Sequence, residues 1–296
     1  MLAPIECVTL IIYARPRLEK SLHHAFGVFK NEKTVLITGA TDGIGLAAAK
    51  MLVAEGHRVL IHGRNPQKLE AAKQTLLDVN SDAEVETYIA DLSVLSEIKP
   101  FADKVKSEHD SLDALINNAG VYTTNNARTK DGFDVRFAVN TLAPYLLTKA
   151  LLPLLQSGRV VNLSSAAQAP VETEALRGNS ALGDGMAYAQ SKLAITIWSQ
   201  EMAKELGNQG PVIIAVNPAS MLGSKMVKDA YGVAGGDINI GADILRRAAL
   251  DEEFADASGK YFDNDIGRFA APHPQAANSG KVAEVMQVID ELVSGF

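Results

Sequence analysis

The chain of 296 residues is poor in cysteine, in positive charge and in long apolar segments, and each shortage excludes a class of protein. Its single cysteine, Cys7, cannot form a disulfide within the chain, which excludes a disulfide-stapled scaffold and predicts a cytoplasmic protein. Lysine and arginine total 28 against 35 acidic residues, a formal net charge of −7 without any basic tract, so we expect no nucleic-acid partner. The six histidines have no spacing typical of metal ligands, and we expect no metal site.

The first 31 residues precede the first strand-like run. Their apolar stretch, residues 8–14, is far shorter than the roughly 18 to 20 residues that span a bilayer, and charged residues follow it at once. A signal peptide would carry its charges before the apolar stretch. We therefore expect no integral membrane segment and interpret residues 1–31 as an N-terminal extension outside the core, with a short docking helix as the alternative. Residues 32–296 are the expected single domain, since 47% hydrophobic content suffices for a large core.

From Lys33 onward, strand-like runs alternate with helical patterns. The strand-like runs are 33–38, 57–62, 85–90, 112–117, 159–163 and 211–216, and the helical patterns are 44–55, 66–79, 94–108, 132–155 and 187–206. Strict alternation predicts an α/β fold, a doubly wound parallel sheet of the Rossmann type with helices on both faces. Ligands of such sheets bind beyond the carboxyl ends of the strands. The residues expected to converge there are Thr38, Gly63, Asp91, Asn117, Ser165 and Pro218.

A glycine-rich turn follows the first strand and opens a helix. Three glycines permit a tight turn and a close approach of the backbone to phosphate oxygens, and the helix N-terminus favours an anion. We predict that this turn binds the pyrophosphate of a dinucleotide through Gly39, Thr41, Asp42, Gly43, Ile44 and Gly45. The alternative is a strand-to-helix turn without a ligand.

A phenol and an ammonium lie one helical turn apart at Tyr188 and Lys192, downstream of Ser165 at a strand end. Reduction of a carbonyl requires a proton donor for the oxygen, and oxidation of an alcohol requires a base. The unperturbed pKa of tyrosine, about 10, is too high for a base at neutral pH, and a nearby cation would lower it. We therefore predict Tyr188 as general acid/base, Lys192 as its tuning cation and ribose ligand, and Ser165 as a hydrogen-bond donor to the substrate oxygen. The alternative is a half-buried aromatic residue and a solvated charge.

These motifs together resemble the short-chain dehydrogenase/reductase superfamily, and within it the retinol-dehydrogenase-like reductases, over about residues 33–262. The resemblance rests on the glycine turn, Asp91-Leu92, Asn117-Asn118-Ala119-Gly120, Asn140, Ser165, Tyr188 and Lys192. It implies that Asn118, Ala119 and Gly120 line the adenosine side, that Asp91 with Leu92 contacts the adenine, and that Asn140 positions a water for proton transfer. The alternatives are an ordinary polar turn at residues 117–120 and a helix-capping role for Asp91.

Cofactor choice is expected to depend on the end of the second strand. A carboxylate there usually holds the 2′-hydroxyl of NAD, whereas a 2′-phosphate needs a cation. The segment 61–65 carries no acid and does carry Arg64, which predicts a preference for NADP(H) over NAD(H). The alternative is a solvated loop charge.

The chain departs from the family after the sixth strand. The resemblance implies Pro-Gly and then a Thr that binds the nicotinamide carboxamide, whereas this chain has Pro218-Ala219-Ser220 and then Ser224. We predict cofactor contacts at Pro218, Ser220 and Ser224. The loop 166–186 is expected to form one wall of the substrate pocket, and residues 221–236 a lid with glycine hinges.

The expected function is an NADP-dependent oxidoreductase that interconverts a carbonyl and an alcohol of a small molecule. The alternatives are a non-catalytic NAD(P)-binding regulatory protein and, on a related fold, a sugar-nucleotide epimerase or dehydratase. The resemblance also implies a homodimer or homotetramer built on the two long helices. The sequence agrees, because residues 193–202 carry more apolar surface than one sheet face needs, and a two-fold contact would bury it. The alternative is that these apolar faces lie inside the monomer.

Overall fold

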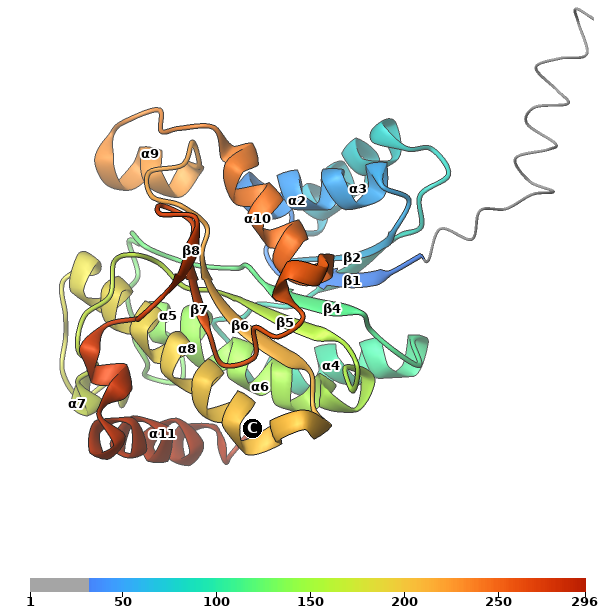
Figure 1. Ribbon diagram of the computed structural model, residues 1–296. Coiled ribbons are helices and arrows are strands. Elements are labelled where there is room, and N and C mark those ends of the chain that lie inside the picture. Colours follow the sequence, from blue (N-terminus) through green and yellow to red (C-terminus); the bar gives the residue numbers. More distant parts are fainter. Residues whose placement is uncertain (1–31) are drawn as a thin grey trace, which may run out of the picture. The chain divides into compact units, whose positions relative to one another are not determined.

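The structure is a computed structural model that describes residues 32–296 (Figure 1). The expectation of an N-terminal extension over residues 1–31 lies outside the described residues. The account below concerns the unit Lys33–Phe296.

One mixed sheet of eight strands runs through this unit in the order β3-β2-β1-β4-β5-β6-β7-β8. Neighbouring strands are parallel, except that β7 and β8 form an antiparallel hairpin at the edge. This confirms the predicted doubly wound, Rossmann-like sheet. The hairpin was not predicted, because its three-residue strands are too short to show a pattern. The strands are β1 (Thr34–Ile37), β2 (Arg58–Gly63), β3 (Val85–Ile89), β4 (Ala114–Asn117), β5 (Arg159–Leu163), β6 (Val212–Asn217), β7 (Tyr261–Asp263) and β8 (Arg268–Ala270).

Helices cover both faces of the sheet (Figure 1). One face packs against α2 (Gly43–Ala54), α3 (Pro66–Val79) and α10 (Ile238–Leu250). The other packs against α4 (Ile98–Glu108), α6 (Ala143–Leu151), α8 (Asp184–Leu206) and α11 (Ser279–Val293). Because both faces are covered, the central strands are continuous apolar runs and not alternating ones. Short helices complete the fold: α5 (Val135–Phe137), α7 (Thr173–Leu176) and α9 (Lys225–Tyr231).

The apolar face of α8 is buried within the monomer, which corrects the basis of the oligomer prediction. Leu193, Ile197 and Trp198 are completely inaccessible to solvent. The Trp198 ring meets that of Tyr145 on α6 edge-on, with centroids 5.5 Å apart. The C-terminal helix α11 packs into the same core cluster. The apolar residues that predicted a subunit contact are therefore accounted for by packing within one chain.

The long helix predicted over residues 132–155 is interrupted. It consists of α5, a π-helical turn at Ala138–Leu142, and α6. The run Val135–Leu154 is long and apolar enough to cross a membrane by length and composition, but 67% of it is buried inside the protein, as in a core helix. π-Helical turns recur at functional sites, and this one carries Asn140.

Candidate active site

A cleft with a cavity volume of about 440 Å³ opens at the carboxyl ends of the strands. Most predicted site residues line it, although they are scattered over more than 180 positions of the chain. They are Gly39, Thr41, Asp42, Gly43, Ile44, Arg64, Asp91, Leu92, Asn118, Ala119, Gly120, Ser165, Tyr188, Lys192, Pro218, Ser220 and Ser224. Asn140 and Gly45 do not line the cleft, and both lie directly behind lining residues.

The glycine turn is built to bring backbone close to a ligand. Gly39 and Gly43 have φ of 67° and 61°, which residues with a Cβ rarely adopt. A Cβ on Gly45 would lie 2.4 Å from Nδ2 of Asn118 and 2.6 Å from the carbonyl oxygen of Gly39. Asn118 in turn donates hydrogen bonds to the carbonyls of Thr38 and Gly39. The segment 117–120 therefore holds the turn in place. Because the glycines of the turn carry no side chain, the backbone itself forms the cradle, which is the hollow of the turn that faces the cleft.

The N-terminus of α2 faces the cleft beside this cradle. Asp42 caps the helix, and its carboxylate accepts a hydrogen bond of 2.7 Å from the amide of Gly43. Because a carboxylate repels phosphate, Asp42 can contact a bound pyrophosphate only if its side chain turns outward. Its predicted cofactor contact stays a prediction.

His62 braces the glycine turn, a role that the sequence reading missed. Its Nδ1 accepts a hydrogen bond from the amide of Gly39, its Nε2 lies 3.0 Å from the carbonyl oxygen of Ala90, and its ring stacks on Phe101. These contacts require the neutral ring with the proton on Nε2. Burial lowers the pKa of His62 to about 4. Nothing in the local sequence signals this role, because both partners come from other strand ends.

The end of the cleft beside the carboxyl end of β2 carries a cation without a partner among the described residues. Arg64 follows β2, is exposed, and makes no hydrogen bond or ion pair with any residue that the structure describes. Asp91 lies opposite on the loop after β3, where its carboxylate accepts hydrogen bonds from the amide and hydroxyl of Ser93. Asp91 therefore caps a local turn at Ser93, close to the capping role of the alternative interpretation. Asp91 also lines the cleft.

At the other end of the cleft, Ser165, Tyr188 and Lys192 come together from β5 and α8. Burial raises the pKa of Tyr188 to about 12, and a hydrogen bond with Ser165 opposes this shift. Burial also lowers the pKa of Lys192 to about 7. Its Nζ donates a hydrogen bond of 2.6 Å to the carbonyl of Leu163 and lies 5.5 Å from the centroid of the Tyr188 ring.

Burial governs the ionisation of Tyr188 in the protein alone. It raises the pKa of the phenol, which is protonated at neutral pH, and the predicted lowering by the Lys192 ammonium together with the positive nicotinamide stays a prediction. Neighbouring Ser164 is distinguished from Ser165 by burial, since its hydroxyl bonds to the backbone of α8 at Lys192. Both serines line the cleft, but Ser164 is buried with its hydroxyl bonded within the protein, whereas Ser165 is only half-buried.

Asn140 lies behind the cleft and orders the loop after β4. Its amide donates to the carbonyl of Val121 and to the hydroxyl of Ser191, and its oxygen accepts from the amide of Val121. The side chain is fully engaged with protein atoms. The predicted water-positioning role stays a prediction, and the structure adds that Asn140 links this loop to α8.

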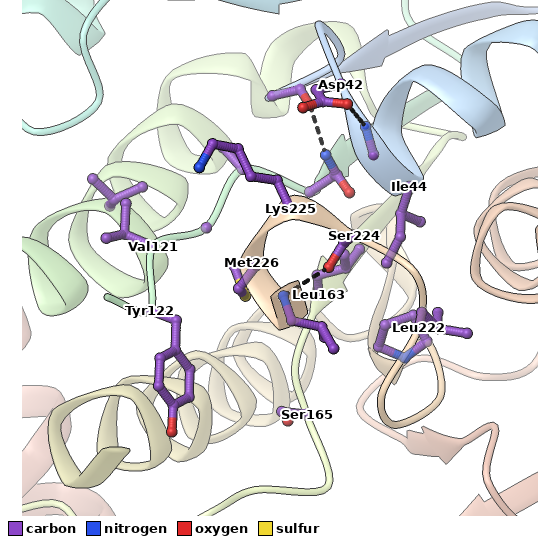
Figure 2. Close-up of a pocket in the computed structure, with 18 of the residues that line it drawn as sticks. Asp42, Ile44, Val121, Tyr122, Leu163, Ser165, Leu222, Ser224, Lys225 and Met226 are labelled. Carbon is purple, nitrogen blue, oxygen red and sulfur yellow. Dashed lines mark hydrogen bonds between the residues drawn. The ribbon is translucent and has the colours of Figure 1, made fainter. Parts of the chain in front are cut away.

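The lid predicted over residues 221–236 contains α9 and forms one side of the cleft. Figure 2 shows Ser224, Lys225 and Met226 between the glycine turn, marked by Asp42 and Ile44, and the end marked by Tyr122 and Ser165. Ser224 caps α9 through the amide of Val227. The base of the lid is closed by hydrogen bonds from Gly223 to Gly236 and from Gly236 to Met221.

The substrate wall differs from the prediction. Of the loop 166–186 only Ala167 lines the cleft, because the rest of the loop turns toward the C-terminal segment, where the amide of Val171 donates to Gln275. Tyr122 provides the wall instead. Its ring packs on that of Tyr188 at 4.7 Å, and its hydroxyl accepts a hydrogen bond of 3.1 Å from Tyr231 of the lid.

Away from the cleft, the described residues contain one group of potential metal ligands, Glu86, Glu108 and His109. The hydroxyl of Tyr88 lies within 3.2 Å of all three side chains. Hydrogen bonding to this hydroxyl therefore explains why the three groups converge.

Comparison with known proteins agrees with this geometry. The family described as short chain dehydrogenase matches residues 33–231. The chain belongs to this family. Human retinol dehydrogenase 13 is 33% identical over 264 residues, which are 82% of this chain and 79% of the relative. The protein is thus an oxidoreductase that acts on CH–OH donors with NAD(P), which confirms the expected enzyme class.

Solved structures show the same fold. A protein of Mycobacterium paratuberculosis superposes with a TM-score of 0.71 at 28% identity, covering 88% of this chain and 93% of that one. An Escherichia coli short chain dehydrogenase solved with NADPH superposes with a TM-score of 0.64 at 25% identity, covering 78% of this chain and 96% of that one.

Proposed function

We propose that the protein is an NADP(H)-dependent reductase of apolar aldehydes or ketones that also oxidises the corresponding alcohols. The observation that carries this proposal is that Ser165, Tyr188 and Lys192 meet at one end of a cleft whose other end holds the glycine turn and Arg64. The glycine turn leaves no room for side chains, since a Cβ on Gly39 would lie 2.8 Å from Ala119 and a Cβ on Gly45 would lie 2.4 Å from Asn118. Backbone alone therefore forms the cradle, which is what a bound dinucleotide requires.

Bound NADP(H) supplies the hydride for reduction and accepts it in oxidation. The chain's own residues manage the oxygen of the substrate: Tyr188 donates its phenolic proton to that oxygen, while Ser165 donates a second hydrogen bond to it. Because burial keeps the pKa of Tyr188 near 12, the phenol is in its acid form at neutral pH, which favours the reductive direction. Lys192 would hold the ribose and, in its protonated form, would place positive charge near the phenol as it ionises.

Arg64 supports the choice of NADP(H). A guanidinium without a partner among the described residues, at the end of β2, is suited to a 2′-phosphate. We expect the KM for NADPH to be lower than that for NADH, and Arg64→Asp to reverse this order because the carboxylate repels the phosphate and accepts a hydrogen bond from the 2′-hydroxyl. Arg128→Asp, a charge reversal at an exposed site that does not line the cleft, is the control. A wild-type preference for NADH would contradict the proposal.

The wall of the cleft supports an apolar substrate. Val121, Tyr122, Val139, Met226 and Tyr231 line it, and the tyrosine hydroxyls of the wall bond to each other. The name of the retinol dehydrogenase relative agrees with this class, and we propose retinoid-like alcohols and aldehydes as substrates. NADPH consumption with retinal, with short apolar aldehydes and with sugar aldehydes tests this; equal activity on sugar aldehydes would contradict it.

A homodimer or homotetramer and a cytoplasmic location stay predictions. Light scattering tests the first, since a mass near 31.5 kDa would indicate a monomer. Cell fractionation tests the second.

A further inference from the structure

The turn that follows β6 holds two residues in an unusual backbone conformation. Ala219 has φ of 109° and Met221 has φ of 54°, and they are the two residues other than glycine with positive φ in the part of the chain that the structure describes. A Cβ makes this region of φ unfavourable, so such a conformation persists only where surrounding contacts impose it. Glycine at position 219 would adopt φ above zero without such strain.

Asp265 supplies the contacts that impose it. Its carboxylate accepts hydrogen bonds from the amide of Ser220 at 2.7 Å, from the hydroxyl of Ser220 at 2.6 Å and from Nδ2 of Asn217 at 2.9 Å. The neighbouring Asn264 donates to the carbonyl of Pro218 at 3.1 Å. All three groups that face Asp265 are donors, so the position requires a side chain that only accepts.

Asp265 is held by the β7–β8 hairpin, which is itself well anchored. The ring of Phe262 on β7 meets those of Phe254 and Phe269 edge-on, at 5.1 and 5.2 Å between centroids. The amide of Asp265 donates to the carboxylate of Asp263. The hairpin also reaches the catalytic end of the cleft, because the hydroxyl of Tyr261 donates to the carbonyl of Ser165 at 3.1 Å.

The strained turn is the start of the lid. Ser220, Met221 and Leu222 line the cleft, and the carbonyl of Met221 accepts the hydrogen bond from Gly236 that closes the base of the lid. A relaxation of φ at Ala219 would therefore shift the residues that lead into α9, and with them one side of the cleft.

We propose that Asp265 is a positioning residue that holds the strained turn 218–221, and through it the start of the lid, in the conformation that binds the dinucleotide. This inference rests on the function proposed for the cleft. Asp265 does not reach the cleft itself and acts through Ser220 and Asn217. Partial burial raises the pKa of Asp265, but the hydrogen bonds from Ser220 and Asn217 outweigh this and leave it below its usual value, so the carboxylate is charged at neutral pH.

The first test uses the protein without cofactor. Hydrogen exchange of the amides of Ser220, Gly223 and Gly236 should be at least about tenfold faster in Asp265→Ala and in Asp265→Asn than in the wild type. The amide of Ser220 loses its acceptor, and the two glycine amides lose the hydrogen bonds at the base of the lid when the turn shifts. Asparagine should not rescue, since its amide nitrogen would face a donor. The control is Asp256→Ala, an exposed carboxylate on the same C-terminal segment, which should leave these amides unchanged.

The second test measures NADPH binding by fluorescence titration and steady-state rates. Asp265→Ala should raise the Kd and KM for NADPH about fivefold or more, while kcat at saturation changes less than about twofold and its pH profile stays the same, because Tyr188 and Lys192 are untouched. The Ala219→Gly background should shrink these effects, since glycine adopts the turn without support. This double variant also keeps the test available if Asp265→Ala alone folds poorly.

Unchanged amide exchange and an unchanged Kd in both Asp265 variants would overturn the inference, as would strictly additive effects of Ala219→Gly and Asp265→Ala. A wild type that binds no dinucleotide would instead overturn the proposed function, while the exchange experiment would still report on the turn.

Discussion

Acidification should destabilise the protein through protonation of His62, and His62→Gln should remove this part of the destabilisation. The ring is buried and neutral, and its Nδ1 accepts a hydrogen bond from Gly39 in the glycine turn. Its pKa is lowered from 6.5 to about 4 by burial. The unfolded chain therefore binds a proton at a higher pH than the folded chain does, and stability falls as the pH drops below about 6.5 and levels off below about 4.

The size of the effect follows from the shift. A lowering of the pKa by about 2.5 units corresponds to about 3 kcal/mol of stability over the whole window, of which about 2 kcal/mol is lost between pH 7 and pH 5. Carboxylates also titrate in this window, so the wild type must be compared with His62→Gln, which stays neutral. Urea unfolding at pH 7 and pH 5 gives the free energy of unfolding of each.

The free energy of unfolding of the wild type should fall by about 2 kcal/mol more than that of His62→Gln between these two pH values. An NMR titration of the His62 ring provides an independent measure of its pKa. Equal losses in the two proteins, or a titration midpoint near 6.5 in the folded protein, would refute the reasoning.

Three further predictions concern the cleft and one the N-terminus. Lys192→Ala should lower kcat and also raise the Kd for NADPH, because one side chain serves both proton transfer and the ribose; a change in neither would show that its position was misread. Gly45→Ala should cost about 1–3 kcal/mol in urea unfolding and weaken NADPH binding, because its Cβ would meet Asn118 and Gly39 within 2.6 Å; full binding would contradict the cradle. The rate of alcohol oxidation should rise with pH above neutrality, because the pKa of Tyr188 is raised to about 12 and the base form is scarce, whereas a flat profile would exclude Tyr188 as the base. A chain that begins at Asn31 should keep its turnover, and a loss would assign a function to the preceding residues.

Local signals predicted most of the fold. Helix α3 has the bounds that its sequence indicates, because Asn65 caps it and Pro66 occupies its first position. The central strands were predicted because burial on both faces leaves apolar runs that stand out from the helical patterns. The convergence of residues on one cleft also followed, since parallel strands end at the same edge of the sheet.

Features that depend on tertiary partners could not be predicted. The π-helical turn at Asn140 has no local sequence signature. The three-residue strand β7 exists through pairing with β6, and β8 through pairing with β7. The apolar face of α8 was assigned to a subunit contact because the packing of α11 on the same core is not visible in the α8 sequence. Likewise, the link between Asp265 and Ser220 joins positions 45 apart in the chain.

The central claim is that the cleft reduces a carbonyl with NADPH through Tyr188. The most direct measurement is the steady-state reduction of retinal or a short apolar aldehyde by the wild type and by Tyr188→Phe, together with the Kd of NADPH for each. Tyr145→Phe, which alters a buried tyrosine that bonds to Asp290 outside the cleft, is the matched control. We predict that Tyr188→Phe lowers kcat at least about 10²-fold with an almost unchanged Kd, and that the control stays active. Turnover of Tyr188→Phe near that of the wild type would contradict the account.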